Sequence, residues 1–252
     1  MKKEETRHAT LYRRYRPSNF DEVRGQDHVV GVLEKEVKVK KPAHAYLFAG
    51  SRGTGKTSVA RILSRELGVS AKDLYEIDAA SNRGIDDIRE LREGVYAMPF
   101  ESPYRFYIID EAHMLTKEAW NAFLKTLEEP PSHAIFVLAT TERDKVPETI
   151  RSRCEIYNFK QPTQAMLAES VADVAQREGY SLERSASELV ALLAEGSFRD
   201  ALSILQKVLA VSENKKIEVS EVEAVSGAPR GELVRQILEA LGKKDSNAGL
   251  KV

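Results

Sequence analysis

A glycine-rich segment at residues 50–57, GSRGTGKT, combines residue types that could bind the phosphates of a nucleotide. It matches the pattern G-x-x-x-x-G-K-[ST], in which glycines let backbone N–H groups curl around the β- and γ-phosphates. Lys56 adds a positive charge there, and the hydroxyl of Thr57 can bind Mg²⁺. We therefore expect ATP and Mg²⁺ as ligands. The expected nucleotide-binding residues of this segment are Gly50, Ser51, Arg52, Gly53, Thr54, Gly55, Lys56, Thr57 and Ser58.

Two adjacent carboxylates, Asp110 and Glu111, come directly after the apolar run at 105–109. An Asp-Glu pair in this position is often a simple loop or a helix cap. Here it follows Lys56 by 54 residues (110 − 56), in a chain that already has a phosphate-binding loop. Ligands of open α/β sheets gather at the carboxyl ends of the strands. We therefore expect Asp110 to hold Mg²⁺ through water and Glu111 to orient or deprotonate the water that attacks ATP.

The string DEAH at 110–113 is weakly similar to nucleic-acid helicases. A helicase needs a second motor domain with its own arginine finger, and residues 163–252 are too few and too helical to form one. We interpret His113 either as a structural residue or as a residue that supports the catalytic groups from behind.

Short apolar runs alternate with amphipathic stretches up to residue 160, and each run ends at Gly, Asp, Thr or Pro, as buried strands tend to do. This alternation indicates an α/β fold with a mainly parallel sheet and helices on both faces. The predicted strands are 45–49, 74–77, 105–109, 134–139 and 156–159. The predicted helices are 27–38, 56–67, 85–96 and 116–128.

After Gln161-Pro162 the pattern becomes helical and we expect the strands to stop. The predicted helices there are 163–177, 185–194, 198–211, 220–225 and 231–241. We therefore expect three parts, with the boundary near Pro162. They are a nucleotide-binding domain at 1–161, a small helical domain at 162–226, and the start of a further helical domain or a tail at 227–252.

The composition is that of a globular protein, with 42% hydrophobic and 31% charged residues and a net charge of −1. The sequence has no apolar run of about 18 residues and no secretory signal, so a membrane protein is not expected. The single cysteine, Cys154, excludes an internal disulfide and a multi-cysteine zinc site. We expect a cytoplasmic protein.

Strings of residues along the whole chain carry a resemblance to one family. Residues 11–226 resemble the ATPase subunit of the bacterial sliding-clamp loader, the γ/τ subunit of DNA polymerase III, in the AAA+ family. The resemblance implies a P-loop AAA+ domain followed by a small helical lid domain. It also implies ATP hydrolysis that opens the sliding clamp and loads it onto primed DNA, in a family counted as part of DNA-directed DNA polymerase III. The strings are LYRRYRP at 11–17, VRGQDH at 23–28, EIDAAS at 76–81, the run at 109–131, LATT at 138–141, SRC at 152–154 and GSFRDAL at 196–202.

The resemblance assigns roles to single residues. Thr141 would sense the γ-phosphate, and Arg199 would reach the phosphates from the lid and couple ATP to the angle between the domains. Arg153 would act in the ATP site of the neighbouring subunit, where such an arginine is worth about 10³ to 10⁵ in rate. By residue type alone, Thr141 is a common strand-end residue, and Arg199 fits a surface ion pair with Asp200 or Glu195. The implied catalytic residues are Glu111, Lys56, Arg153, Thr141 and Arg199, and the implied adenine and ribose contacts are Tyr12, Arg16 and Val23.

The resemblance also implies partners. These are other clamp-loader subunits in a hetero- or homo-pentamer, the sliding clamp and primer–template DNA, with no membrane. Arg83 and Lys117 are candidate contacts to DNA phosphates, since such loaders grip the DNA backbone rather than read its bases.

The sequence departs from the family in two places. The interval 68–73 lacks the usual four-cysteine module, so zinc is not expected, and beyond Gly227 only one predicted helix stands where the collar domain should follow. Assembly without a full collar is therefore an open question. Two alternative functions also stay open: a non-catalytic, nucleotide-binding scaffold subunit of the same assembly, or another AAA+ DNA motor.

Overall fold

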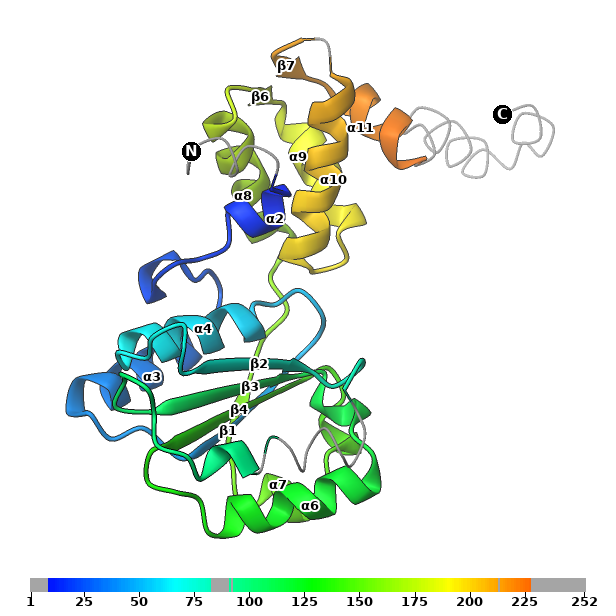
Figure 1. Cartoon of the computed structure of the whole chain (residues 1–252). Helices are drawn as coiled ribbons and strands as arrows, with labels where there is room; N and C mark the ends of the chain where they lie inside the picture. The colour runs from blue at the N-terminus through cyan, green and yellow to red at the C-terminus, as the bar shows by residue number, and fades with distance from the viewer. Residues whose placement is uncertain (1–8, 83–90, 92, 213, 228–252) are drawn as a thin grey trace, which may run out of the picture. The chain divides into compact units, whose positions relative to one another are not determined.

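The computed structural model describes residues 9–82, 91, 93–212 and 214–227 (Figure 1). Their contacts divide them into a sheet unit, Arg16–Pro162, and a helical unit formed by residues 9–15 together with residues 163–227. Most of the predicted helix at 85–96, all of the predicted helix at 231–241 and the candidate DNA contact Arg83 lie outside the described residues.

The sheet unit is built on a parallel five-stranded sheet in the order β2-β3-β4-β1-β5. Strand β1 lies between β4 and β5 and is buried along its whole length, as an apolar run covered on both faces should be. Because the strands are parallel, their carboxyl ends meet at one edge of the sheet, where ligand-binding residues gather. The strands are β1 Ala45–Ala49, β2 Leu74–Asp78, β3 Arg105–Asp110, β4 Ala134–Thr140 and β5 Glu155–Asn158.

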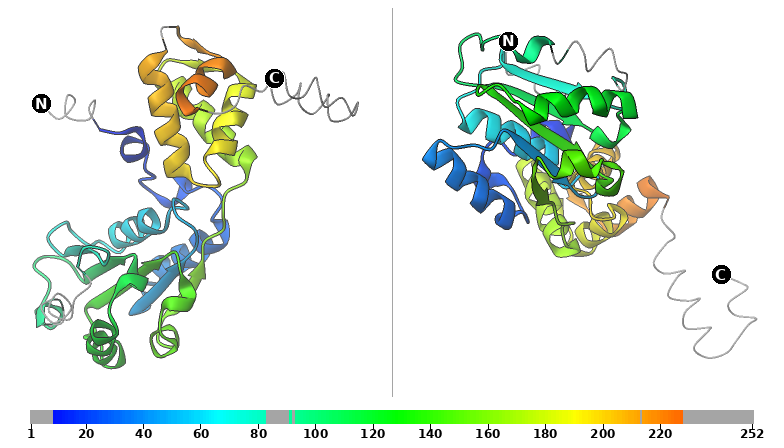
Figure 2. Two further views of the ribbon diagram at one scale, coloured as in Figure 1. Left: turned by 90° about the vertical axis from the view of Figure 1, so that its right-hand side faces the viewer. Right: turned by 90° about the horizontal axis from the view of Figure 1, so that it is seen from below.

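Each face of the sheet has its own core, because successive side chains of a strand point to opposite faces. Tyr46 and Phe48 of β1 pack with α3 and α4, whereas Leu47 packs with α6 and α7. Figures 1 and 2 show these two pairs of helices on opposite sides of the sheet. The helices are α3 Asp27–Val39, α4 Lys56–Glu66, α6 Lys117–Glu128 and α7 Glu148–Arg151. Apart from 85–96, the predicted strands and helices of this unit are confirmed to within one residue at each end.

The helical unit has a single core shared by its helices. The four predicted helices between residues 163 and 225 are confirmed. Two of them begin with a hydroxyl cap: Thr163 accepts from the N–H of Met166, and Ser197 accepts from the N–H of Asp200. The last one begins with a capping box formed by Glu218 and Glu221. Among the described residues, no helix has both the length and the apolar character needed to cross a membrane. The helices are α2 Leu11–Arg14, α8 Gln164–Arg177, α9 Arg184–Leu193, α10 Phe198–Val211 and α11 Val219–Ser226.

The expectation that strands stop at residue 162 is wrong. Two short strands, β6 Ser181–Leu182 and β7 Lys216–Ile217, pair in parallel within the helical unit. Ile217 is fully buried in the helical core, so the pairing connects the ends of α8 and α10 over that core. Strands of two residues are too short to produce an alternating pattern, which explains why the sequence did not reveal them.

The segment that contains α2 belongs by its contacts to the helical unit. Leu11 is buried in the helical core, and its N–H donates to the Gln206 side chain at 2.8 Å. The hydroxyl of Tyr15 donates to Glu178, and Arg14 forms an ion pair with the same carboxylate. The predicted nucleotide-binding domain at 1–161 included this segment, so the contact-based division differs from it here.

Candidate nucleotide-binding site

The phosphate-binding loop leaves the carboxyl end of β1 and leads directly into α4. Gly50 packs so closely against Phe159, the residue after β5, that a side chain there would overlap it. Gly53 and Gly55 have φ angles of 73° and 101°, a region that favours glycine, and Gly55 caps α4. The loop therefore presents its N–H groups and the amino end of a helix at one place, an arrangement suited to anions.

Lys56 is 6% exposed and lies inside the loop. Its Nζ donates to the carbonyl oxygens of Gly50 at 2.8 Å and Ser51 at 2.9 Å. Burial lowers the pKa of Lys56, and the nearby carboxylates of Glu111 and Asp110 oppose this by raising it. A phosphate group placed here would favour the charged form in the same way as the two carboxylates.

Thr57 lies in the first turn of α4 and Asp110 is the last residue of β3, and the two meet at the edge of the sheet. The Thr57 hydroxyl donates to Asp110 Oδ2 at 2.9 Å. A hydroxyl oxygen beside a carboxylate is a donor set that Mg²⁺ accepts, since this ion keeps several waters and takes one or two protein ligands together with phosphate oxygens. The two residues predicted to hold the metal are thus adjacent, and their chemistry fits the ion.

Glu111 stands at a sharp reversal of the chain between β3 and the 3₁₀ turn η3, Ala112–Met114. Its φ of 48° is left-handed, which is uncommon for a residue with a side chain. Its Oε2 accepts a hydrogen bond from the hydroxyl of Thr141, which follows β4, at 3.2 Å. The predicted water-activating carboxylate and the predicted γ-phosphate sensor are therefore in direct contact.

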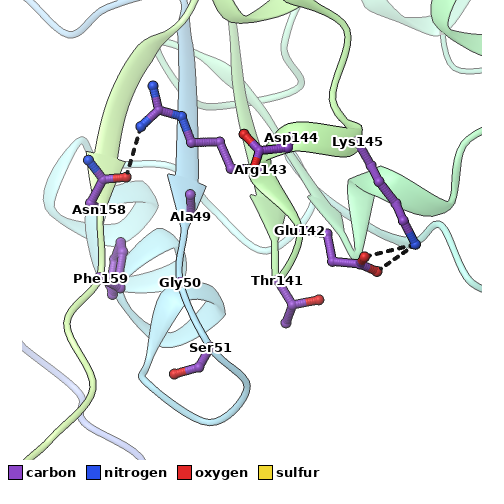
Figure 3. A pocket seen from close by; sticks show the side chains of 10 residues that line it. All are labelled: Ala49, Gly50, Ser51, Thr141, Glu142, Arg143, Asp144, Lys145, Asn158 and Phe159. Carbon is purple, nitrogen blue, oxygen red and sulfur yellow. Dashed lines mark hydrogen bonds and ion pairs between the residues drawn. The ribbon is translucent and has the colours of Figure 1, made fainter.

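An open hollow of about 540 Å³ lies beside the loop (Figure 3). Ser51 and Thr141 line it from the carboxyl ends of β1 and β4, and Phe159 lines it beside β5. Two cationic side chains that line it have partners within the sheet unit. Arg143 donates to the side chain of Asn158 at 3.4 Å, and Lys145 forms an ion pair with Glu142. The hollow gives the loop and the sensor threonine an accessible surface at the edge of the sheet.

Gln26 is a buried residue of this region to which sequence reasoning gave no role. Its amide donates to the carbonyl of Lys160 at 2.7 Å and to that of Thr54 at 3.5 Å, and it accepts from the N–H of Lys160 at 3.0 Å. The side chain thus braces the phosphate-binding loop against the chain that leaves β5. In the sequence, Gln26 follows Gly25 and precedes a predicted helix. Polar residues in this position often serve only as helix caps, so the sequence did not indicate the bracing role.

Arg153 lies near the end of α7, with its guanidinium on the surface. It donates to the carbonyl of Thr149 at 2.7 Å and forms an ion pair with Glu128, the last residue of α6, at 2.8 Å. Its neighbour Cys154 is partly buried, and burial raises the pKa of that thiol to about 12. The arginine is thus fixed to two helices, and the thiol stays protonated at neutral pH.

The remaining predicted site residues fall into both units. In the helical unit, the guanidinium of Arg199 lies over the ring of Tyr12 at 5.0 Å from its centroid. In the sheet unit, Val23 packs against the core on the α3 and α4 side, and Arg16 is half-buried where the unit begins. Lys117 is exposed at the first position of α6.

Two family models match the chain. One described as "DNA polymerase III, delta subunit" covers residues 68–163, and one described as "DNA polymerase III clamp loader subunit, ATPase lid domain" covers residues 166–214. The chain is 41% identical over 233 residues to the DNA polymerase III subunit gamma/tau of Mycoplasma pneumoniae, covering 84% of this chain and 34% of that protein. It is 38% identical over 265 residues to the DNA polymerase III subunit tau of Bacillus subtilis, covering 97% and 47%. The chain is homologous to the γ/τ subunits of DNA polymerase III.

This γ/τ homologue spans less than half the length of either relative. Among solved structures, the RuvB Holliday junction branch migration motor of Thermotoga maritima matches it with a TM-score of 0.71 at 23% identity, covering 90% of this chain and 79% of that chain. At that identity the likeness shows the fold alone. The fold is that of a P-loop ATPase domain followed by a lid, as predicted.

Proposed function

We propose that this γ/τ homologue is an ATPase subunit of a clamp loader, which hydrolyses ATP to open a sliding clamp and load it onto primed DNA. Its homology to γ/τ subunits supports the clamp-loader role. The observation that carries the ATPase activity is the pairing of Thr57 with Asp110 and of Thr141 with Glu111, next to the buried Lys56.

The proposed reaction uses residues at the carboxyl edge of the sheet. The loop N–H groups and Lys56 would bind the phosphates. Thr57, and Asp110 through water, would hold Mg²⁺, which would neutralise charge that develops during transfer. Glu111 orients or deprotonates the attacking water. Its hydrogen bond to Thr141 ties that carboxylate to the residue proposed to sense the γ-phosphate.

Further residues take the roles that the resemblance to γ/τ subunits implies. Arg153 would complete the ATP site of a neighbouring subunit, and its ion pair with Glu128 holds the guanidinium on the surface, where another chain can reach it. Arg199 would reach the phosphates from the lid. The adenine and ribose would lie beside Tyr12, Arg16 and Val23.

The proposed partners are other clamp-loader subunits, the sliding clamp and primer–template DNA. Lys117, exposed at the amino end of α6, is a candidate phosphate contact, and Arg83 is a second. Because such contacts release counterions, DNA affinity should fall steeply with salt, and Lys117→Ala should reduce that slope by about one. DNA binding that is insensitive to salt would contradict this assignment.

The proposed function is tested by measuring ATP turnover of the full chain alone, with primed DNA, and with primed DNA plus a bacterial sliding clamp. A clamp-loader ATPase should be stimulated by DNA and further by the clamp. Measurable turnover that neither component changes would favour another AAA+ motor. ATP binding without turnover under all three conditions would favour a scaffold subunit.

A further inference from the structure

His113 is nearly buried at the point where the ends of β3 and β4 meet. It sits in the middle of η3, which the left-handed turn at Glu111 folds back toward β4. Its side chain is 7% exposed. Ala112, the preceding residue, is fully buried in the core on the α6 side, so the position of the turn is fixed by packing.

The imidazole of His113 has an oxygen partner at each nitrogen. Nδ1 lies 3.1 Å from the hydroxyl of Thr140 and 3.5 Å from Oε2 of Glu111, and Nε2 lies 3.3 Å from Oε1 of Glu142. Thr140 is fully buried, and its hydroxyl also accepts the N–H of Glu142 at 3.0 Å. Contacts at both nitrogens fix the orientation of the ring as well as its place.

These contacts connect the two strand ends that carry the proposed chemistry. The Glu111 oxygen that faces His113 is the same Oε2 that accepts from Thr141. His113 also contacts the two neighbours of Thr141 in the chain, Thr140 through the same Nδ1 and Glu142 through Nε2. The ring therefore braces the carboxylate and the segment of the sensor threonine against one another.

We propose that His113 is a positioning residue that holds the Glu111 carboxylate in the geometry required for ATP hydrolysis. This inference rests on the proposed function, in which Glu111 prepares the attacking water. A group displaced by about 1 Å from its reacting partner can reduce a rate about 100-fold. His113→Ala should therefore lower kcat about 10- to 100-fold and leave the KM for ATP nearly unchanged, because the phosphate-binding loop keeps its own contacts.

Three variants separate positioning from a general effect on folding. His113→Asn places an amide near the position of Nδ1 and should recover part of the lost kcat. In a Glu111→Gln background, His113→Ala should cause no further loss of the residual turnover, since the residue acts through Glu111. The matched control is His133→Asn, because His133 is a partly buried histidine of the same unit that contacts the carbonyl of Val95 at 3.0 Å and none of the proposed catalytic groups. That variant should keep the wild-type kcat.

Three kinetic results would each overturn the inference. The first is an unchanged kcat in His113→Ala, and the second is an effect of this variant mainly on the KM for ATP. The third is that His113→Ala lowers turnover by the same factor in the wild-type and the Glu111→Gln backgrounds. A second measurement does not depend on turnover. The NMR resonances of the His113 ring, recorded without nucleotide, should move on Glu111→Gln and stay in place on Glu128→Gln. If the wild-type chain does not hydrolyse ATP, the proposed function fails, and the ring resonances alone decide whether His113 senses Glu111.

Discussion

A methyl group added at Gly50 should disturb both the sheet and the phosphate-binding loop. A Cβ at this position would lie 2.6 Å from the carbonyl oxygen of Phe159 and 2.8 Å from its Cβ, and both distances are too short for such contacts. One of the two atoms belongs to the backbone, so no change of side-chain rotamer can relieve the overlap. Gly50→Ala must therefore displace β5 from β1 or displace the loop.

The expected magnitude follows from these contacts. Overpacking of a close-fitting site costs about 1–3 kcal/mol, and for a chain of this size each kcal/mol lowers Tm by roughly 2–4 °C, so Tm should fall by about 2–12 °C. The carbonyl of Gly50 also accepts from Lys56 Nζ, so a shifted loop misplaces that charge. Loss of one charge-assisted contact is worth about 1.5–3 kcal/mol, which predicts an ATP affinity lower by about tenfold or more.

The assay is thermal unfolding without nucleotide, followed by titration with a fluorescent ATP analogue. Gly31→Ala in α3 is the matched control, since a Cβ there has no neighbouring atom within 4 Å and alanine favours a helix more than glycine does. Its Tm should stay the same or rise slightly. If Gly50→Ala matched the wild type in both Tm and affinity, the packing of the loop against Phe159 would be refuted.

Three other perturbations have defined outcomes. Burial alone would raise the pKa of Asp73, but three consecutive backbone N–H groups bond its carboxylate and lower the pKa to about 2. The ionised Asp73 carboxylate therefore stabilises the fold above the pKa of the unfolded chain, near 4, and this stabilisation is lost as the pH falls toward 2. Asp73→Asn should be about 2–3 kcal/mol less stable than the wild type at pH 7 and nearly equal to it at pH 2. Thermal unfolding at the two pH values measures this difference. Tyr12→Leu should reduce kcat/KM for ATP roughly 2- to 5-fold, because this is the contribution of an exposed cation–π contact. In an Arg199→Ala background, the same substitution should cause no further loss. An equal loss in both backgrounds would contradict the contact between Tyr12 and Arg199. Mixing Arg153→Ala protein with Glu111→Gln protein should produce more ATP turnover than the two variants give separately, because one kind of hybrid site then has both an intact Glu111 and an intact Arg153. If Arg153 acts within its own chain, the mixture should give only the sum of the two separate turnover rates.

The parts of the site that the sequence predicted are those whose signals are local. The loop at 50–57 is a contiguous motif, and the apolar runs before Asp110 and Thr141 are long enough to be recognised as buried strands. Parallel strands then bring their carboxyl ends to one edge, so the meeting of Thr57 with Asp110 follows from chain order and motif together.

The parts that the sequence did not predict depend on partners distant in the chain. The role of Gln26 is defined by Lys160, and the orientation of His113 is defined by Thr140 and Glu142. Neither residue differs by type from a cap or a surface polar group. The place of Tyr12 in the helical unit likewise arises from tertiary contacts, such as that with Arg199, which no periodicity encodes.

The central claim is that one site binds ATP at the P-loop and hydrolyses it through Glu111. The most direct test is to measure ATP affinity and single-turnover hydrolysis of the wild type and of Glu111→Gln, over a range of protein concentrations and with primed DNA and clamp present. The account predicts equal affinities and a hydrolysis rate lower by about 10² to 10⁴ in the variant. Equal hydrolysis rates in the two proteins would contradict it.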